Sequence, residues 1–273
     1  EAYHGTGRLF TKAIPKIMVP TTAGTGSEVT AGAVLVNEAT KFKRAIGGPL
    51  VTPDYAVLTP ELTLSLPPHV TAATGMDALG HAVESYTAHC ANEVTRMYSR
   101  EAFRLVANNL PKVLAEPGNL EARRQTQLGA CLAGYAIYNS NTGAAHAISY
   151  ALGLYHRVPH GLAIGWLLPE VVRINAREGC ERYADLWALI DGVSTTGTPQ
   201  GDAEAFAEWL LRYPGREALG RELQDFDVQE NQLDMLAEKG LGLKPALENN
   251  PVPFELQHSR EVMGRLFERG RAL

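Results

Sequence analysis

The hydrophobic pattern of this chain changes at Pro67-Pro68, and that change limits the folds open to it. Before this point, apolar runs of four or five residues end in turn residues, which is typical of buried strands. After it, apolar residues recur at three- and four-residue intervals, which is typical of amphipathic helices. The pattern predicts an α/β region over residues 1–66 followed by an all-α region over residues 67–273.

Strands are expected in the first region at 16–20, 33–36 and 55–58, and a turn is expected at 5–8. Helices are expected in the second region, with the clearest segments at 71–87, 120–138, 143–155, 161–176, 180–190, 202–212, 229–239 and 258–271. Three strands are few for an independent α/β domain. We therefore expect the first region to belong to a larger sheet whose other strands lie outside this sequence.

Composition narrows the possible partners and compartment. The formal net charge is −5 and the pI is near 5.9, whereas nucleic acids and anionic membranes favour a basic face. We therefore expect no nucleic acid and no membrane as a partner. Cys90, Cys131 and Cys180 have neither metal-binding nor redox spacing, which favours reduced thiols and a cytoplasmic protein. The sequence carries no recognisable signal peptide or transmembrane segment.

Asp77 and His81 stand four positions apart in the apolar segment 71–87, so both are expected on one helical face. His146 and His160 occur in later segments that are also predicted to be helical. Three imidazoles and one carboxylate suit a divalent metal such as Fe(II) or Zn(II). For Asp77 and His81 alone, a solvated helix surface is the common alternative. The apolar flanks weaken that alternative, because an unpaired buried charge is costly.

Residues 20–28 (PTTAGTGSE) form a loop rich in Gly and Thr between an expected strand and a possible short helix. Small residues let a ligand approach the backbone, where N–H groups and Thr hydroxyls could bind phosphate or ribose oxygens. The segment is not a GxGxxG fingerprint, and without a lysine it is not a P-loop. From the residues alone, a tight turn that ends in a helix cap remains the alternative.

Taken together, these segments resemble the iron-dependent (group III) alcohol dehydrogenase family. The resemblance spans nearly the whole chain and is carried, in the family's order, by residues 20–30, 60–63, 66–68, 73–86, 145–147, 158–161 and 249–251. It implies that residues 1–66 are an α/β remnant of a Rossmann-like nucleotide domain. It also implies that residues 67–273 are an all-α metal-binding domain, in the arrangement known from dehydroquinate synthase-like proteins.

The resemblance further implies a ligand set and a reaction. The family holds its metal with one Asp and three His, and these match Asp77, His81, His146 and His160. In the family, the metal acts as a Lewis acid on the substrate oxygen while hydride passes to or from C4 of a nicotinamide. Iron is the expected metal, with Zn possible, and the expected cofactor is NAD or NADP.

The family's nicotinamide cofactor contacts a Thr-Thr-Ala-Gly-Thr loop and a lysine in the same domain. The matching loop residues are Thr21, Thr22, Gly24 and Thr25. The matching lysine is Lys43 or, less well, Lys41. A Gly-Gly-Gly-Ser segment that binds the cofactor diphosphate in the family is expected to lie upstream of residue 1.

Two further departures from the family concern single residues. Many members carry a His four residues after the third ligand, where it relays the alcohol proton, and this chain has Tyr150 there. A phenol can relay a proton but is a poor base at neutral pH. His156 is the nearest other candidate along the chain. Thr59 replaces an Asp that usually precedes Pro-Glu-Leu, which we interpret as a structural change.

The function expected from these features is a metal- and NAD(P)-dependent alcohol dehydrogenase or aldehyde reductase that acts on a small alcohol or carbonyl. One alternative is a Zn-dependent enzyme related to glycerol dehydrogenase or dehydroquinate synthase. Another is a truncated helical metal-binding domain without a competent cofactor cleft and without turnover. An exposed sheet edge invites pairing with another chain, so a homo-oligomer such as a dimer is expected.

Overall fold

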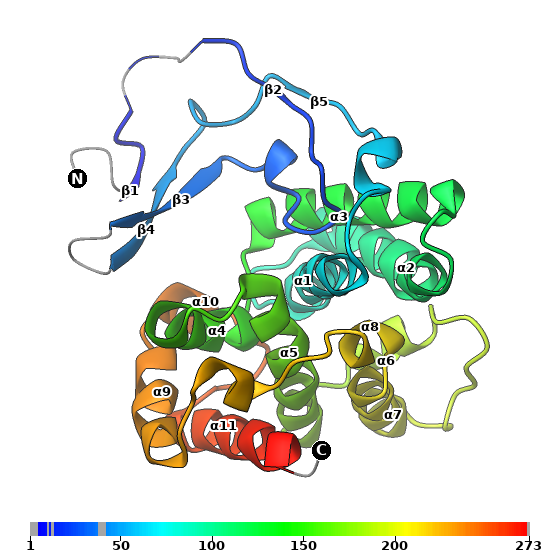
Figure 1. Cartoon of the computed structure of the whole chain (residues 1–273). Coiled ribbons are helices and arrows are strands. Elements are labelled where there is room, and N and C mark those ends of the chain that lie inside the picture. Colours follow the sequence, from blue (N-terminus) through cyan, green and yellow to red (C-terminus); the bar gives the residue numbers. More distant parts are fainter. Residues whose placement is uncertain (1–4, 10, 12–13, 38–41, 272–273) are drawn as a thin grey trace.

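The computed structural model describes residues 5–9, 11, 14–37 and 42–271. The first part of the chain forms two small sheets (Figure 1). One has the order β1-β4-β3, in which β4 (Phe42–Gly47) pairs antiparallel with β3 (Gly32–Asn37) and parallel with β1 (Gly5–Thr6). The other pairs β2 (Ile17–Met18) in parallel with β5 (Tyr55–Ala56).

All three predicted strands are present, although two of them are shorter than expected. The turn predicted at 5–8 was wrong for its first two residues, which form β1 against β4. The strand β4 was not predicted, because its Lys43 and Arg44 interrupt any apolar run. A 3-10 helix, η1 (Ser27–Val29), follows the Gly/Thr loop as expected, and a second, η2 (Pro60–Thr63), leads toward the helical region.

The helical region begins with α1 (Pro68–Thr87), immediately after Pro67. The remaining α-helices are α2 (Glu93–Ala115), α3 (Leu120–Ser140), α4 (Ala144–His156), α5 (His160–Arg177), α6 (Tyr183–Trp187), α7 (Pro199–Leu211), α8 (Pro214–Glu217), α9 (Leu233–Gly240), α10 (Lys244–Glu248) and α11 (Leu256–Arg271). Most predicted segments match these bounds closely. The segment 180–190 contains only the short α6, and 229–239 divides into η4 (Glu230–Gln232) and α9.

The core is built around α1, whose residues from Gly75 to Thr87 are all buried. Helices α2, α3 and α5 pack against it, and Gly75 permits one close contact, since a Cβ there would lie 2.5 Å from a Leu110 methyl carbon. Figure 1 shows α3 lying between the first part of the chain and the other helices. Within the described residues, no helix has both the length and the apolarity needed to cross a bilayer.

Candidate metal centre and cofactor loop

Three of the four predicted metal ligands lie together. Asp77, His146 and His160 each offer a ligand atom, and these atoms lie within 4.8 Å of one another. Asp77 Oδ1 is 3.5 Å from His146 Nε2 and 3.4 Å from His160 Nε2. His81 lies outside this group of three, with its Nε2 3.9 Å from Asp77 Oδ1 and its ring stacked on that of His146 at 4.6 Å.

Two glycines allow the helices that carry these residues to approach closely. His160 is the first residue of α5, and a Cβ on the next residue, Gly161, would lie 2.2 Å from the Ala73 carbonyl oxygen of α1. A Cβ on Gly80 would lie 2.6 Å from the Ile164 side chain of α5. With contacts this short, a side chain at either position would force the neighbouring helix to shift. The close approach of α5, which carries His160, to α1, which carries Asp77, therefore depends on glycine at both positions.

A Gly161→Ala variant is expected to push the start of α5 away from α1. Overpacking of this kind typically costs about 1–3 kcal/mol, so the melting temperature should fall. Metal affinity should fall as well, because His160 would be displaced. The matched control is Gly153→Ala in α4, where the nearest atom to the new Cβ is 3.6 Å away. Equal melting temperatures for the two variants, measured calorimetrically, would contradict the packing role of Gly161.

The cluster is buried on one side and open on the other. The side chains of Asp77, His81 and His146 are only 4–7% exposed, whereas that of His160 is 36% exposed. The solvated-surface alternative for Asp77 and His81 is therefore wrong. Within the described part of the chain, the buried atoms Asp77 Oδ1 and His146 Nε2 have no hydrogen-bond partner. Such atoms are costly to bury unless something binds them, so they fit a divalent cation.

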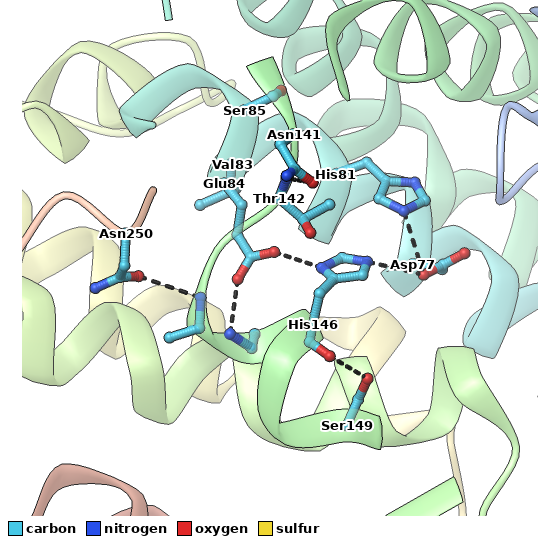
Figure 2. A network of polar contacts seen from close by, with 12 residues as sticks. Asp77, His81, Val83, Glu84, Ser85, Asn141, Thr142, His146, Ser149 and Asn250 are labelled. Carbon is cyan, nitrogen blue, oxygen red and sulfur yellow. Dashed lines mark hydrogen bonds and ion pairs between the residues drawn. The ribbon is translucent and has the colours of Figure 1, made fainter. Parts of the chain in front are cut away.

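Glu84 is a residue of this site to which the sequence prediction gave no role. Its carboxylate pairs with His146 Nδ1 and accepts a hydrogen bond of 2.7 Å from the Ala145 N–H (Figure 2). When His146 is neutral, a proton on Nδ1 leaves Nε2 as the unprotonated atom that faces Asp77. The available signal was its position in an apolar helix, seven residues after Asp77 and three after His81.

The residues of the cluster differ in pKa and therefore in their protonation state at pH 7. Burial alone would lower the pKa of His146, but the Glu84 and Asp77 carboxylates raise it to about 9. Burial lowers the pKa of His81 to about 4, against the opposing attraction of Asp77. Burial would raise the pKa of Asp77, but the surrounding histidines, His81 foremost, hold it below its usual range. At pH 7 the metal-free cluster therefore combines protonated His146, neutral His81 and ionised Asp77.

Metal binding at pH 7 is expected to release about one proton from His146, because a coordinating imidazole nitrogen must be unprotonated. Apparent affinity for Zn(II) should therefore rise about tenfold per pH unit between about pH 7 and 8.5, below the His146 pKa of about 9. His81 is already neutral in this range and adds no slope. Calorimetric titration in two buffers of different ionisation enthalpy counts the protons. An affinity independent of pH would contradict His146 as a ligand.

The Gly/Thr loop lies against α1, which carries Asp77 and His81. A Cβ on Gly24 would lie 2.9 Å from Thr74 Cβ, one turn of α1 before Asp77. Thr21 and Thr25 are exposed and Thr22 is half-buried. Thr25 Oγ1 accepts a hydrogen bond from the Ser27 N–H at 3.2 Å, so the loop is also a tight turn before η1.

The remaining candidates from the sequence are the cofactor lysine and the two residues considered for proton relay. Lys43 lies in β4, but its side chain is outside the described part of the structure, and Lys41 lies wholly outside the described residues. Tyr150 stands one turn after His146 on α4, and burial raises its pKa. His156 ends α4 and its Nδ1 lies 3.1 Å from the Phe226 carbonyl oxygen. Ten residues of helix, about 15 Å, separate His156 from His146 along α4, which leaves Tyr150 nearer to the cluster.

Comparison with known families gives a consistent result. A family model described as "Fe-containing alcohol dehydrogenase family, C-terminal" matches residues 71–267. Another, described as "Iron-containing alcohol dehydrogenase", matches residues 1–60. Together the two matches include the Gly/Thr loop and all four predicted metal ligands.

Curated relatives agree with these matches. The long-chain-alcohol dehydrogenase 1 of Geobacillus thermodenitrificans (strain NG80-2) is 35% identical over 255 residues, which are 92% of this chain and 63% of the relative. The 1,3-propanediol dehydrogenase of Citrobacter freundii is 39% identical over 241 residues, which are 88% of this chain and 62% of the relative. The chain thus spans less than two thirds of the length of these relatives.

Solved structures agree on the fold. The crystal structure of a 1,3-propanediol oxidoreductase superimposes with a TM-score of 0.91 at 36% identity, covering 97% of this chain and 69% of that one. The sulfoacetaldehyde reductase of Bifidobacterium kashiwanohense in complex with NAD⁺ gives a TM-score of 0.83 at 34% identity, covering 97% and 68%. The predicted architecture, a Rossmann-like α/β part followed by an all-α part, is confirmed. The chain belongs to the iron-containing alcohol dehydrogenase family.

Proposed function

We propose that this chain is an oxidoreductase that transfers hydride between a small alcohol or carbonyl compound and NAD(P), with a metal held by Asp77, His81, His146 and His160. The observation that carries the proposal is the convergence of Asp77, His146 and His160, with buried Oδ1 and Nε2 atoms that have no hydrogen-bond partner among the described residues. Fe(II) is the metal we favour, because the family is described as iron-containing, and Zn(II) suits the same ligands.

Each residue of the cluster has a distinct part in this mechanism. When bound, the metal supplies a Lewis acid that polarises the substrate oxygen. Glu84 keeps the proton of His146 on Nδ1, so Nε2 stays available to the metal. The greater exposure of His160 supports approach of the substrate oxygen from that side. Burial of the other three side chains excludes water and strengthens the electrostatic interactions inside the site.

The cofactor residues we propose are Thr21, Thr22, Gly24, Thr25 and Lys43. Packing of Gly24 against Thr74 supports the four loop residues, because it holds the loop one helical turn from Asp77. The solved reductase is described with NAD⁺. The NADPH-dependent butanol dehydrogenase of Clostridium saccharobutylicum is 30% identical over 256 residues, 92% of this chain and 64% of that one. Both cofactors are therefore included in the proposal.

For the proton of the alcohol we propose a relay through the Tyr150 hydroxyl. Its support is the position of Tyr150 one helical turn after His146. Because burial raises its pKa, the phenol stays neutral at pH 7 and would pass a proton by donating and accepting hydrogen bonds. It would not act as a base that stores the proton.

We further propose that residues 1–66 and 67–273 are two domains, that the protein is a homo-oligomer such as a dimer, and that it is cytoplasmic. The change from strands to helices at Pro67 supports the division. Exposed apolar residues on the small sheets, with Ile17 63% and Tyr55 66% exposed, support an oligomer. Two buried cysteines and the exposed Cys90, all free thiols, favour a reducing compartment.

Metal reconstitution followed by cofactor and substrate screening tests the proposal. The purified protein would be loaded with Fe(II) or Zn(II), analysed for metal content, titrated with NADH and NADPH by fluorescence, and assayed on a panel of small alcohols and aldehydes. One metal per chain, cofactor binding and alcohol oxidation are expected. A chain that binds no metal after reconstitution would disprove the proposed mechanism.

A further inference from the structure

One face of α3 lies under the Gly/Thr loop (residues 20–28), which is called the cofactor loop below. Residues 123, 127, 130, 131 and 134 recur at three- and four-residue intervals, so they follow a single face of this helix. All of them lie against the chain before α1, at Pro20, Gly26, Glu28 or Thr63. Figure 1 shows this arrangement, with the loop before η1 reaching down to α3. The cofactor loop is therefore held between α3 on one side and Thr74 of α1 on the other.

The closest contact joins two glycines. A Cβ on Gly134 would lie 2.4 Å from the Gly26 carbonyl oxygen, and a Cβ on Gly26 would lie 2.6 Å from the Ala130 carbonyl oxygen. Gly26 also has φ 61°, in the left-handed region that favours glycine. The backbone of the loop and the backbone of α3 thus touch directly, and no side chain fits between them.

Contacts on either side extend this one. Gln127 Nε2 donates a hydrogen bond of 3.3 Å to the Pro20 carbonyl at the start of the loop. Glu28 of η1 is buried near Cys131, where burial and then the Glu28 carboxylate raise the pKa of the thiol to about 12. Arg123 Nη1 donates to the Thr63 carbonyl of η2 at 2.7 Å. Both ends of the loop, and the segment that leads into α1, are therefore fixed to α3.

We propose that α3 sets the position of the nicotinamide-binding loop relative to the metal cluster, with Gly134 and Gln127 as positioning residues. The inference rests on the proposed function, because it assumes that the loop binds the nicotinamide. The same helix that contacts the loop packs on α1, which carries Asp77 and His81. The helix α3 therefore fixes the position of the loop relative to the metal ligands on α1. A shift of the loop by about 1 Å can cost hydride transfer on the order of 100-fold.

Gly134→Ala tests this inference, with Gly264→Ala as the control. Both are Gly-to-Ala changes inside helices, but a Cβ at Gly264 in α11 meets no atom within 4 Å. In Gly134→Ala, amide hydrogen exchange of residues 20–30 should quicken, and the dissociation constant for NADH should rise about tenfold or more. Metal content should stay as in the unaltered protein. Gly264→Ala should change none of these.

The outcomes separate this inference from the proposed function. Unchanged exchange and unchanged NADH affinity in Gly134→Ala, beside an unaltered protein that binds NADH, would overturn the inference alone. No NADH binding by the unaltered protein would overturn the cofactor assignment and the inference with it. If Gly134→Ala does not fold, Gln127→Met removes the hydrogen bond to Pro20 without adding bulk. It should then shift exchange and NADH affinity in the same direction, and no shift would overturn the inference.

Discussion

An Asp77→Asn variant is expected to bind Fe(II) or Zn(II) about 100-fold more weakly or worse, because a lost ligand costs more than a lost outer partner. The substitution keeps the size of the side chain but removes its charge. Asp77 Oδ1 is the atom that His81, His146 and His160 all face, at 3.4–3.9 Å. Without the carboxylate, the metal would lose both a ligand and the negative charge that offsets its own.

Asp234→Asn is the matched control for Asp77→Asn. Asp234 is 76% exposed and pairs with Arg260 on the surface, so its neutralisation should leave metal affinity unchanged. Affinity is measured by competition with a chromophoric chelator, and circular dichroism checks that both variants fold. Near-normal metal affinity in Asp77→Asn would show that this carboxylate is not a ligand.

Glu84→Gln is expected to weaken metal binding about 10- to 100-fold, the usual cost of losing a carboxylate behind a metal-bound histidine. The amide of Gln lacks the negative charge that supports His146. Its oxygen accepts hydrogen bonds but its NH2 group does not, whereas the two oxygens of Glu84 accept from both His146 and Ala145. Glu84 also raises the pKa of His146, so its loss eases deprotonation at pH 7. The deficit in metal affinity should therefore be larger at about pH 9, where proton competition is weaker.

Glu170→Gln serves as the control for a buried Glu-to-Gln change. Glu170 is 6% exposed in α5 and pairs with Arg173 instead of a residue of the cluster. Both variants can lose stability, but only Glu84→Gln should lose metal affinity with the stated pH dependence. Equal metal affinities in the two variants, measured at pH 7 and 9, would remove the role assigned to Glu84.

The helices were the most predictable part of the fold. The predicted segments 71–87, 120–138 and 143–155 correspond to α1, α3 and α4 with shifts of a few residues at their ends. Long helices with a buried face repeat their apolar residues several times, so the pattern is redundant. The short α6 broke the pattern because five residues provide little more than one turn. Its packing against α7 and α2, which no local pattern records, contributes to holding it in place.

The site was predictable only as far as its residue types. Asp77, His81, His146 and His160 could be named from their spacing and resemblance, but their convergence depends on contacts such as that between Gly161 and Ala73. Strand β4 depends likewise on its pairing with β3, which local sequence does not encode. Interactions between segments that are distant in the sequence thus determine both the convergence of the metal ligands and the formation of β4.

Asp77, His146 and His160 come from three helices, and residues 78–145 separate the first two along the chain. An ion bound to all three would cross-link these segments, and the unfolded chain could hold that cross-link only by closing a long loop at an entropic cost. Binding to the folded state alone adds about 2.7 kcal/mol to the unfolding free energy when free metal is about 100 times its dissociation constant. Metal supply would therefore govern how much of the protein survives proteolysis, as well as how much of it is active.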